Sequence, residues 1–452
     1  MRSEMKQRIR IQKRMSLSPQ TIRIQHRLAE WSKGGRKHWD LYRWLYDPKI
    51  LFDATKLILR NDGAAGVDKV RCDEVKGKEW EFAVKLAAKM KSGRHRPSAV
   101  RRVYIPKRDG RQRPLGIPSL EDRVIQRALV LLLEPIYETV FLANSYGFRR
   151  GRSGEECVAV TANEVYKHRL ILEADIESFF DRVSHRKLLG MMKGQIVDPR
   201  ILNLIRSYLE AGYVERDKPW QPTWEGTPQG GPLSPTLANV YLHYALDVRF
   251  KEMGWKATQL FRYCDDFVIA SRDESELVSV REHLDRWMAE AGLRLKESKT
   301  RMVDMRNEKR GRESHFDFLG FRFHLRAFWD NPKRFWIARQ PSERARLGLR
   351  DNLKSRIRAD LTPGVARNVM KSIWRGWSNY FRYGNSNRIF YKELGSVRRI
   401  VWRYLRQKYR QQKRPVSWWE LSHLEKWIRT DLKPLSVIPN FLSQQQRQYV
   451  LL

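Results

Sequence analysis

The amino-acid sequence predicts an α+β body followed by an all-helical tail, and three observations support this fold class. Over residues 61–328, segments that alternate apolar and polar residues like strands are interspersed with segments of helical periodicity. Beyond Asn331 the spacing of apolar residues is almost wholly helical. Charge follows the same division, because residues 1–60 carry +10 and residues 331–452 carry +20, whereas the 270 residues between them carry only +8.

The composition indicates a polyanionic partner. The chain has 452 residues, of which 89 are Lys or Arg and 51 are Asp or Glu, and its formal net charge is +38. So large a surplus is typical of proteins that bind nucleic acid. A peripheral membrane protein is not favoured, because the sequence shows no basic amphipathic helix, lipidation site or membrane-length apolar run. Cys72, Cys157 and Cys264 form no ligand cluster, so we expect no disulfide framework or zinc site and a reducing, intracellular setting.

The N-terminal third predicts helices around a loop and a hairpin. A basic, helical extension covers residues 1–60, and its Arg-rich start reads either as an organellar transit peptide or as a nucleic-acid-binding arm. We favour the arm, because basic residues continue well beyond it. Helical spacing is clear from Trp39 to Leu59, and a Gly-rich loop follows at 61–70. Residues 101–118 alternate around Asp109-Gly110, which predicts a tight hairpin, and 120–141 predicts a long helix.

Strands and helices also alternate through the central part of the chain. Strands are predicted at 169–176, on both sides of the acidic turn in FRYCDDFVIA (Phe261 to Ala270), and as one strand at 316–324. Helices are predicted from Ser184, over 201–211, after a turn within 228–246, and over 274–292, where Gly292 would end the helix.

The stretch FRYCDDFVIA places two adjacent carboxylates inside an apolar run. Burying Asp265 and Asp266 side by side is unfavourable unless a cation neutralises them. Asp175 ends the strand RLILEAD, and the three acids would converge if the strands are neighbours in one sheet. Such an oxygen-rich site suits two Mg²⁺ ions, which can carry in-line phosphoryl transfer. Taken alone, the pair is more simply explained as an exposed turn, with Asp175 as a strand cap.

Neighbouring segments reverse that assessment. Tyr263-Cys264-Asp265-Asp266 matches the Tyr-x-Asp-Asp signature of reverse transcriptases, with Cys264 where alanine is usual. Further segments resemble that family's motifs in the required order: YIPKRDGRQRPLGIPSLEDRVIQRAL, SYGFRRGRS, ADIESFFDRVSH, GTPQGGPLSPTLANVYL, GLRLKESKT and FDFLGFRFH. Residues 373–410 resemble the maturase region of group II intron-encoded proteins. The sequence therefore resembles the group II intron-encoded reverse transcriptase/maturases, of the type that lacks an endonuclease domain.

The resemblance implies a right-hand polymerase. Fingers and palm, with an antiparallel palm sheet and helices, would occupy residues 61–328, a helical thumb or maturase domain X 329–400, and a basic nucleic-acid-binding region 401–452. The implied activity is RNA-directed DNA polymerase (nucleotidyltransferase) together with maturase activity. The implied partners are a group II intron RNA, an RNA template and a DNA primer or target, in the retrotransposition of a mobile element. A cytoplasmic, nucleoid-associated bacterial protein is expected, with an organellar source less favoured and monomer or dimer left open.

Catalytic roles follow from the same resemblance. Asp175 and Asp265 would be metal ligands, helped by the backbone carbonyl of Ile176, and Asp266 matches the second acid of the signature. Lys299 matches a candidate general acid for pyrophosphate.

Other motif residues would bind substrates. Lys107 and Arg113 would reach the dNTP triphosphate, Phe180 would be the steric gate, and Gln229 and Gly230 would approach nucleotide and template. Phe318, Leu319 and Gly320 resemble the primer grip of the family. Ordinary strand packing would predict the same residues, so both explanations stay open.

The tail combines an apolar stripe with basic residues. Thr362 and Pro363 predict a helix start, and Trp374 and Phe381 belong to a stripe that we interpret as thumb packing. Basic side chains interleaved with this stripe or on the next helix would contact nucleic acid: Lys371, Arg375, Arg382, Arg398, Arg399 and Arg403.

Alternatives to this interpretation differ in what they predict. No His- and Cys-rich endonuclease segment follows Tyr409, so we expect use of an existing 3′ end rather than target cleavage. A group II-like reverse transcriptase domesticated for defence or a CRISPR-associated role is the nearest alternative, and the maturase-like tail argues against it. A non-catalytic RNA-binding splicing factor is the other, and Asp175, Asp265 and Asp266 argue against that.

Overall fold

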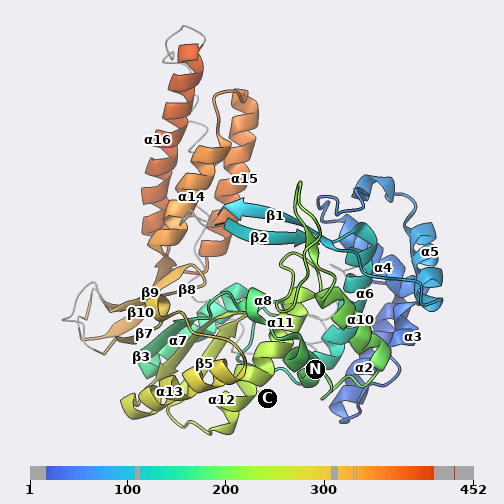
Figure 1. Cartoon of the computed structure of the whole chain (residues 1–452). Coiled ribbons are helices and arrows are strands. Elements are labelled where there is room, and N and C mark those ends of the chain that lie inside the picture. Colours follow the sequence, from blue (N-terminus) through green and yellow to red (C-terminus); the bar gives the residue numbers. More distant parts are fainter. Residues whose placement is uncertain are drawn as a thin grey trace.

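The computed structural model describes residues 17–106, 112–306, 314–328, 330–331, 333–411 and 432. The α+β prediction is confirmed: helices and sheets form a body, and a helical arm of α14, α15 and α16 rises from it (Figure 1). Within the described residues, no helix is both long and apolar enough to cross a membrane.

The N-terminal part is helical, as predicted, but the helix expected over Trp39 to Leu59 is two helices. The chain breaks at Asp47-Pro48, where the Asp47 side chain accepts a hydrogen bond from the Lys49 N–H and Pro48 occupies the first helical turn. Proline disfavours the helical conformation of the residue before it, so a new helix starts there. The elements of this part are α2 (Pro19–Lys33), α3 (Tyr42–Leu45), α4 (Pro48–Leu59), η1 (Cys72–Glu74), α5 (Glu79–Lys91) and α6 (Leu120–Tyr137).

The described residues form three sheets, in which the predicted strands pair with others that were not predicted, among them those at 213–214 and 301–304. The predicted hairpin pairs β1 (Val100–Pro106) with β2 (Gln112–Ile117), and β4 (Tyr213–Val214) adds to β1 in parallel. The largest sheet has the order β5-β6-β3-β7, all antiparallel. Its strands are β3 (Leu170–Asp175), β5 (Thr258–Tyr263), β6 (Asp266–Ser271) and β7 (Arg301–Asp304).

Helices connect and cover this four-stranded sheet. They are α7 (Gly154–His168), α8 (Phe179–Arg182), α9 (His185–Met192), α10 (Pro199–Leu209), α11 (Ser234–Leu242), the π-helical turn η2 (His243–Asp247), α12 (Val248–Glu252), α13 (Glu274–Glu290) and η3 (Glu297–Lys299). The start predicted at Ser184 is confirmed, since its side chain caps α9.

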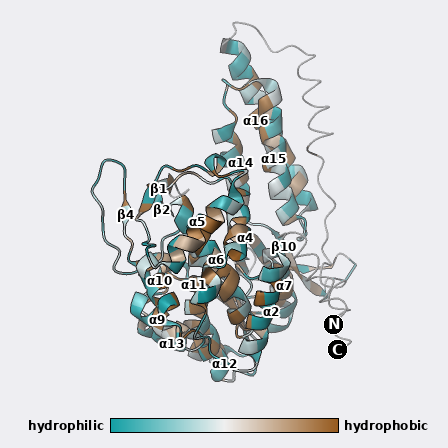
Figure 2. Ribbon diagram, turned by 90° about the vertical axis from the view of Figure 1, so that its right-hand side faces the viewer, coloured by the Kyte–Doolittle hydropathy of each residue, from teal (hydrophilic) through white to brown (hydrophobic). Residues whose placement is uncertain are grey.

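Both faces of the four-stranded sheet are buried, in two separate cores. Phe267 and Ile269 of β6 join the core that contains α6, α11 and α13, whereas Val268 and Ala270 join the core formed with α7 and the C-terminal helices. Successive strand residues point to opposite faces, so a strand buried on both sides is continuously apolar, as FVIA is. Among the helices of the body, hydrophobic residues concentrate along α4 and α6 (Figure 2).

Two predictions for residues 316–341 need correction. FDFLGFRFH is two strands, β8 (His315–Phe318) and β9 (Phe321–Ala327), because Leu319 and Gly320 form a turn with φ of +49° and +77°. The chain beyond Asn331 is not helical at once, because β10 (Phe335–Pro341) pairs with β9 along its whole length. Helical propensity is weak evidence where a neighbouring strand edge offers hydrogen bonds.

The tail then becomes helical as predicted, with α14 (Glu343–Arg356), α15 (Pro363–Phe381) and α16 (Asn387–Gln411). Thr362 is the N-cap of α15, and Pro363 follows it. Two residues of the predicted stripe, Trp374 and Phe381, are buried. The buried Glu393 carboxylate of α16 joins α14 through Arg346 and Arg350, each at 2.7 Å.

Replacing Trp374, 1% exposed on α15, by alanine should lower the free energy of unfolding by about 3–5 kcal/mol, because the change removes buried contacts and leaves a cavity. Val365→Ala on the same helix, at a side chain 48% exposed, is the matched control and should change it by less than about 0.5 kcal/mol. Denaturant unfolding of the full chain measures both. Equal stability of the two variants would contradict the packing described here.

Candidate active site

The acidic pair sits at the tip of the β5–β6 hairpin. Tyr263 pairs with Asp266 in the ladder, so Cys264 and Asp265 form a two-residue turn. Cys264 has a φ of +57°, a left-handed conformation that costs roughly 1–2 kcal/mol for a residue other than glycine. Such strain persists only where surrounding contacts hold it.

The sheet register brings Asp175 to this tip. Asp175 is the last residue of β3 and lies directly opposite Asp266 of β6. Directly paired residues on neighbouring strands point to the same face of the sheet. The predicted convergence of acids from distant parts of the chain is therefore present in the structure.

The three carboxylates repel one another, and the pKa values of Asp265 and Asp266 reflect this. Burial raises the pKa of Asp265, and the Asp175 carboxylate adds to that rise. The pKa of Asp266 is raised to about 6, first because surrounding protein withdraws the carboxylate from water and then because of Asp265 and Asp175. Asp266 remains partly open to solvent at the tip, so screening limits the energy involved. A site that opposes its own negative charge favours a cation.

Lys299 supplies a positive charge to the same site. Its Nζ forms an ion pair with Oδ2 of Asp175, and the two side chains are 44% and 22% exposed. The backbone N–H of Lys296 donates to the carbonyl of Asp175 at 2.8 Å, which holds the segment of Lys299 beside β3. The residue predicted as a general acid therefore lies in contact with a predicted metal ligand.

The donor set fits Mg²⁺ held jointly with a substrate. No three His, Cys, Asp or Glu side chains among the described residues form a metal-binding group, so these residues offer no closed cage. Mg²⁺ is commonly bound through one or two carboxylates together with substrate phosphates and water. Asp175 and Asp265 would be those carboxylates. The backbone carbonyl of Ile176 was predicted as a further ligand. The Ile176 side chain is buried, and its backbone forms an isolated antiparallel β-bridge with Leu295.

Among the residues predicted to bind the nucleotide, Arg113 is close enough for its charge to act on Asp265 of the tip. Phe179 is buried in the core, while Phe180, the predicted steric gate, is only partly buried. Arg113 of β2 is exposed, and its positive charge lowers the pKa of Asp265. Lys107 lies outside the described residues.

Gln229 and Gly230 pack directly on the β1–β2 hairpin. The Gly116 N–H donates to the carbonyl of Gln229 at 2.6 Å, and the Gln229 side chain donates to Asp181 at 3.4 Å. Gly230 has a φ of +116°, and a Cβ there would lie 2.6 Å from the Gly116 carbonyl oxygen. Only glycine fits this approach, so the loop position itself requires it.

The predicted primer-grip residues form the β8–β9 turn. Phe318 is buried, and the carbonyl of Leu319 accepts a hydrogen bond from the Tyr380 hydroxyl of α15 at 2.8 Å. The carbonyl of Gly320 accepts one from the Ser342 N–H at 2.8 Å. The turn therefore links the sheet body to the helical arm.

The basic residues predicted to contact nucleic acid lie along the helical arm. Lys371 and Arg375 are on α15, Arg382 directly follows it, and Arg398, Arg399 and Arg403 are on α16. Arg375, Arg398, Arg399 and Arg403 are exposed. They are thus placed on the helical arm that rises from the body in Figure 1.

Sequence reasoning missed two buried arginines, one of them next to the acidic turn. Arg262 precedes the signature tyrosine and pairs with Asp247, both with fully buried side chains. The sequence did offer one indication of a buried partner for Arg262, namely a charged residue in an otherwise apolar strand. Arg123 of α6 is 7% exposed, and its Nε and Nη2 have no hydrogen-bond partner within the described residues. No sequence pattern distinguishes Arg123 from a helix-surface arginine.

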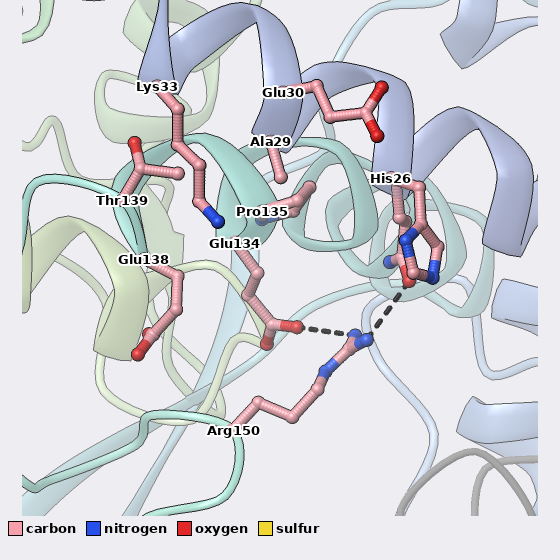
Figure 3. Close-up of a pocket in the computed structure, with 10 residues that line it drawn as sticks. His26, Ala29, Glu30, Lys33, Glu134, Pro135, Glu138, Thr139 and Arg150 are labelled. Carbon is pink, nitrogen blue, oxygen red and sulfur yellow. Dashed lines mark hydrogen bonds and ion pairs between the residues drawn. The ribbon is translucent and has the colours of Figure 1, made fainter. Parts of the chain in front are cut away.

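A separate cavity of about 470 Å³ lies between α2 and α6. Glu134 and Arg150 form an ion pair of 2.8 Å at its wall, with Glu30 and Lys33 nearby (Figure 3). None of the predicted site residues lines it.

Comparison with known proteins identifies two domains. Residues 105–323 match the family described as Reverse transcriptase (RNA-dependent DNA polymerase). Residues 348–427 match the family described as Group II intron, maturase-specific domain. The first range contains the carboxylates of β3 and the β5–β6 tip, and the second contains most of the helical arm.

Several characterised and uncharacterised proteins are similar to the chain. Group II intron-encoded protein LtrA of Lactococcus lactis subsp. cremoris is 40% identical over 206 residues, or 45% of this chain and 34% of LtrA. Protein YkfC of Escherichia coli (strain K12) is 32% identical over 312 residues, or 60% of this chain and 81% of YkfC. An uncharacterized 91 kDa protein in the cob intron of Schizosaccharomyces pombe is 36% identical over 171 residues, or 38% of this chain and 21% of that protein. The chain therefore spans about a third of the length of LtrA but most of YkfC.

Removing the Asp266 charge should stabilise the protein when divalent cations are chelated. The folded-state pKa of about 6 exceeds the ordinary value of 3.8, so between these two pH values the folded state binds more protons than the unfolded state. The free energy of unfolding therefore falls as the pH rises from about 4 to about 6. Asp266→Asn should therefore raise the free energy of unfolding at pH 7 by on the order of 1 kcal/mol after solvent screening, and by nothing near pH 4.

Asp273→Asn is the matched control with the opposite sign. Hydrogen bonds from Ser275 and Glu276 lower the pKa of Asp273, so this variant should be less stable than the native chain at pH 7. Denaturant unfolding across pH in the presence of a chelator measures both. An Asp266→Asn protein that is no more stable than the native chain at pH 7 would contradict the electrostatic description.

Proposed function

Because the chain belongs to the family of group II intron-encoded reverse transcriptases and maturases, we propose that it is an RNA-directed DNA polymerase that also assists intron splicing. One observation carries the catalytic part of this proposal: Asp175 lies opposite Asp266 in the β3–β6 ladder, next to the turn that bears Asp265. A family member that had kept the fold only to bind RNA would have no need of these mutually repelling acids.

The chain's own residues supply binding and orientation in the reaction. Asp175 and Asp265 would hold the divalent cations, and Arg113 and Lys107 would neutralise the triphosphate of the incoming dNTP. Phe180 packs against its sugar and excludes a 2′-hydroxyl, while the Gln229–Gly230 backbone lets the nucleotide approach closely. When bound, the two Mg²⁺ ions activate the primer 3′-hydroxyl and stabilise the leaving pyrophosphate.

Lys299 is suited to a proton transfer late in the reaction. Its ammonium group lies against Asp175, so it would stand beside the leaving pyrophosphate if Asp175 binds the cation. Donation of its proton to the leaving oxygen would offset one negative charge of the pyrophosphate. The β8–β9 turn at Phe318, Leu319 and Gly320 would support the primer strand.

The helical arm supports the maturase part of the proposal. Exposed Arg375, Arg398, Arg399 and Arg403 give it phosphate-binding groups, and its residues fall in the maturase-specific match. The RNA would be a group II intron, with an RNA template and a DNA primer or target as the other nucleic-acid partners. The proposed setting is a bacterial cytoplasm, at the nucleoid, and similarity to bacterial proteins supports the bacterial part of this setting.

Asp265→Asn should abolish DNA synthesis but spare RNA binding. The change keeps the size of the side chain and removes the charge that binds the cation, so incorporation of dTTP on poly(rA) with an oligo(dT) primer should fall by about a thousandfold or more. Binding of a structured RNA, measured by filter binding at fixed salt, should stay within about twofold of the native chain because the basic arm is unchanged.

Asp217→Asn is the matched control, since it is the same change at an aspartate on an exposed loop after β4. It should retain native incorporation. Undiminished synthesis by Asp265→Asn would overturn the catalytic assignment, and absence of synthesis by the native chain with RNA binding intact would favour the splicing-factor alternative.

A further inference from the structure

A fully buried ion pair lies beneath the acidic tip. Arg262 of β5 is 0% exposed, and its Nε donates to Oδ1 of Asp247 at 2.8 Å while its Nη2 donates to Oδ2 of the same carboxylate. Asp247, also 0% exposed, ends the π-helical turn η2, a rare element that frequently occurs at functional sites. Burial alone lowers the pKa of Arg262, and the Asp247 carboxylate more than offsets that, so the guanidinium stays charged.

The remaining arm of the guanidinium reaches the strained turn. Nη1 of Arg262 donates to Oδ1 of Asn239 at 3.0 Å and to the backbone carbonyl of Cys264 at 3.0 Å. That carbonyl belongs to the peptide unit joining Cys264 to Asp265. Because a peptide unit is planar, holding its oxygen also fixes the direction in which the chain enters Asp265.

The opposite side of the turn is closed by the segment before α7. A Cβ at Gly147 would lie 2.4 Å from the backbone nitrogen of Cys264, so the two backbones are in close contact. The Asn239 amide donates to the carbonyl of Gly147 at 2.6 Å, and the backbone of Arg262 pairs with Asn144 and Tyr146 at 2.9 Å each. Asn239 therefore links the arginine to the wall against which the turn is pressed.

Stability alone does not account for this arrangement. A buried ion pair is generally no more stabilising than well-packed apolar residues of similar volume, because both charges lose their hydration. Its advantage is direction: a guanidinium presents donors in a fixed planar fork, which apolar packing cannot do. Here the fork connects one rigid helical turn to one peptide carbonyl next to a metal-ligand residue.

We infer that Arg262 is a positioning residue, oriented by Asp247 and Asn239, that holds the Cys264 carbonyl so that the Asp265 carboxylate meets the divalent cation in the geometry nucleotide transfer requires. This inference rests on the proposed function, since it concerns the same site. Arg262 itself touches neither nucleotide nor cation in this role.

The deciding variant replaces both charges together, as R262M/D247L, which leaves no unpaired buried charge. It should unfold at nearly the native denaturant concentration. Its affinity for Mn²⁺, measured by electron paramagnetic resonance without nucleotide, should fall about tenfold. Its kcat for dTTP incorporation should fall about a hundredfold, as expected for a small misplacement of a catalytic group. The Mg²⁺ concentration for half-maximal rate should rise, while KM for dTTP stays within about twofold.

Two further variants keep the test decisive. R262K retains the charge but lacks the planar, forked set of donors. If the double variant fails to fold, R262K should show the same Mn²⁺ and Mg²⁺ changes to a smaller extent. Glu393→Gln is the control: it weakens a comparable buried carboxylate–arginine cluster between α14 and α16, and should lower stability while leaving Mn²⁺ affinity native.

Folded R262M/D247L or R262K with native Mn²⁺ affinity and native Mg²⁺ dependence would overturn the inference, because only a structural role would remain. A native chain that binds Mn²⁺ through Asp265 but adds no nucleotide would instead refute the proposed function, and the Mn²⁺ comparison would still decide the role of Arg262.

Discussion

Mutual repulsion among carboxylates at one end of a buried sheet is the constraint on which the rest of the site depends. The register of β3 against β6 places Asp175 opposite Asp266, and a two-residue turn places Asp265 beside them. The grouping is unfavourable by itself, because each charged carboxylate raises the free energy of its charged neighbours. The surrounding groups of opposite sign, Lys299 in direct contact and Arg113 at longer range, compensate only in part.

The scaffold holds this unfavourable grouping through buried contacts on every side. Both faces of the four-stranded sheet are packed, so the strands cannot shift register without moving their apolar side chains to the wrong core. Glycines at 147 and 230 allow backbone to approach backbone where a side chain would collide. The strained Cys264 turn is held from below by the Arg262 guanidinium and from the side by the Gly147 segment. Rigid elements thus fix each functional group, while the basic arm lies on separate helices.

Much of this arrangement was predictable from the sequence, for identifiable reasons. Period-two alternation predicted the β1–β2 hairpin, an acidic turn between apolar runs predicted the β5–β6 hairpin, and the Thr362-Pro363 cap predicted the start of α15. Local residues also indicated the Asp47-Pro48 break and the Leu319-Gly320 turn. Both were missed because the helical or strand pattern continues on either side of them. The strand β10 was missed because its partner β9 decides its conformation. The pair Arg262–Asp247 could not be found in this way, since side-chain contacts between distant elements leave no periodic signal.

The claim that these acids share divalent cations is tested most directly by an experimental structure of the chain with Mg²⁺, a primer–template and an unreactive dNTP. The account predicts a cation within about 2.1 Å of oxygens from both Asp175 and Asp265, in contact also with the nucleotide phosphates. A structure with bound nucleotide in which no cation joins these two carboxylates, or in which Asp175 contacts only Lys299, would contradict it.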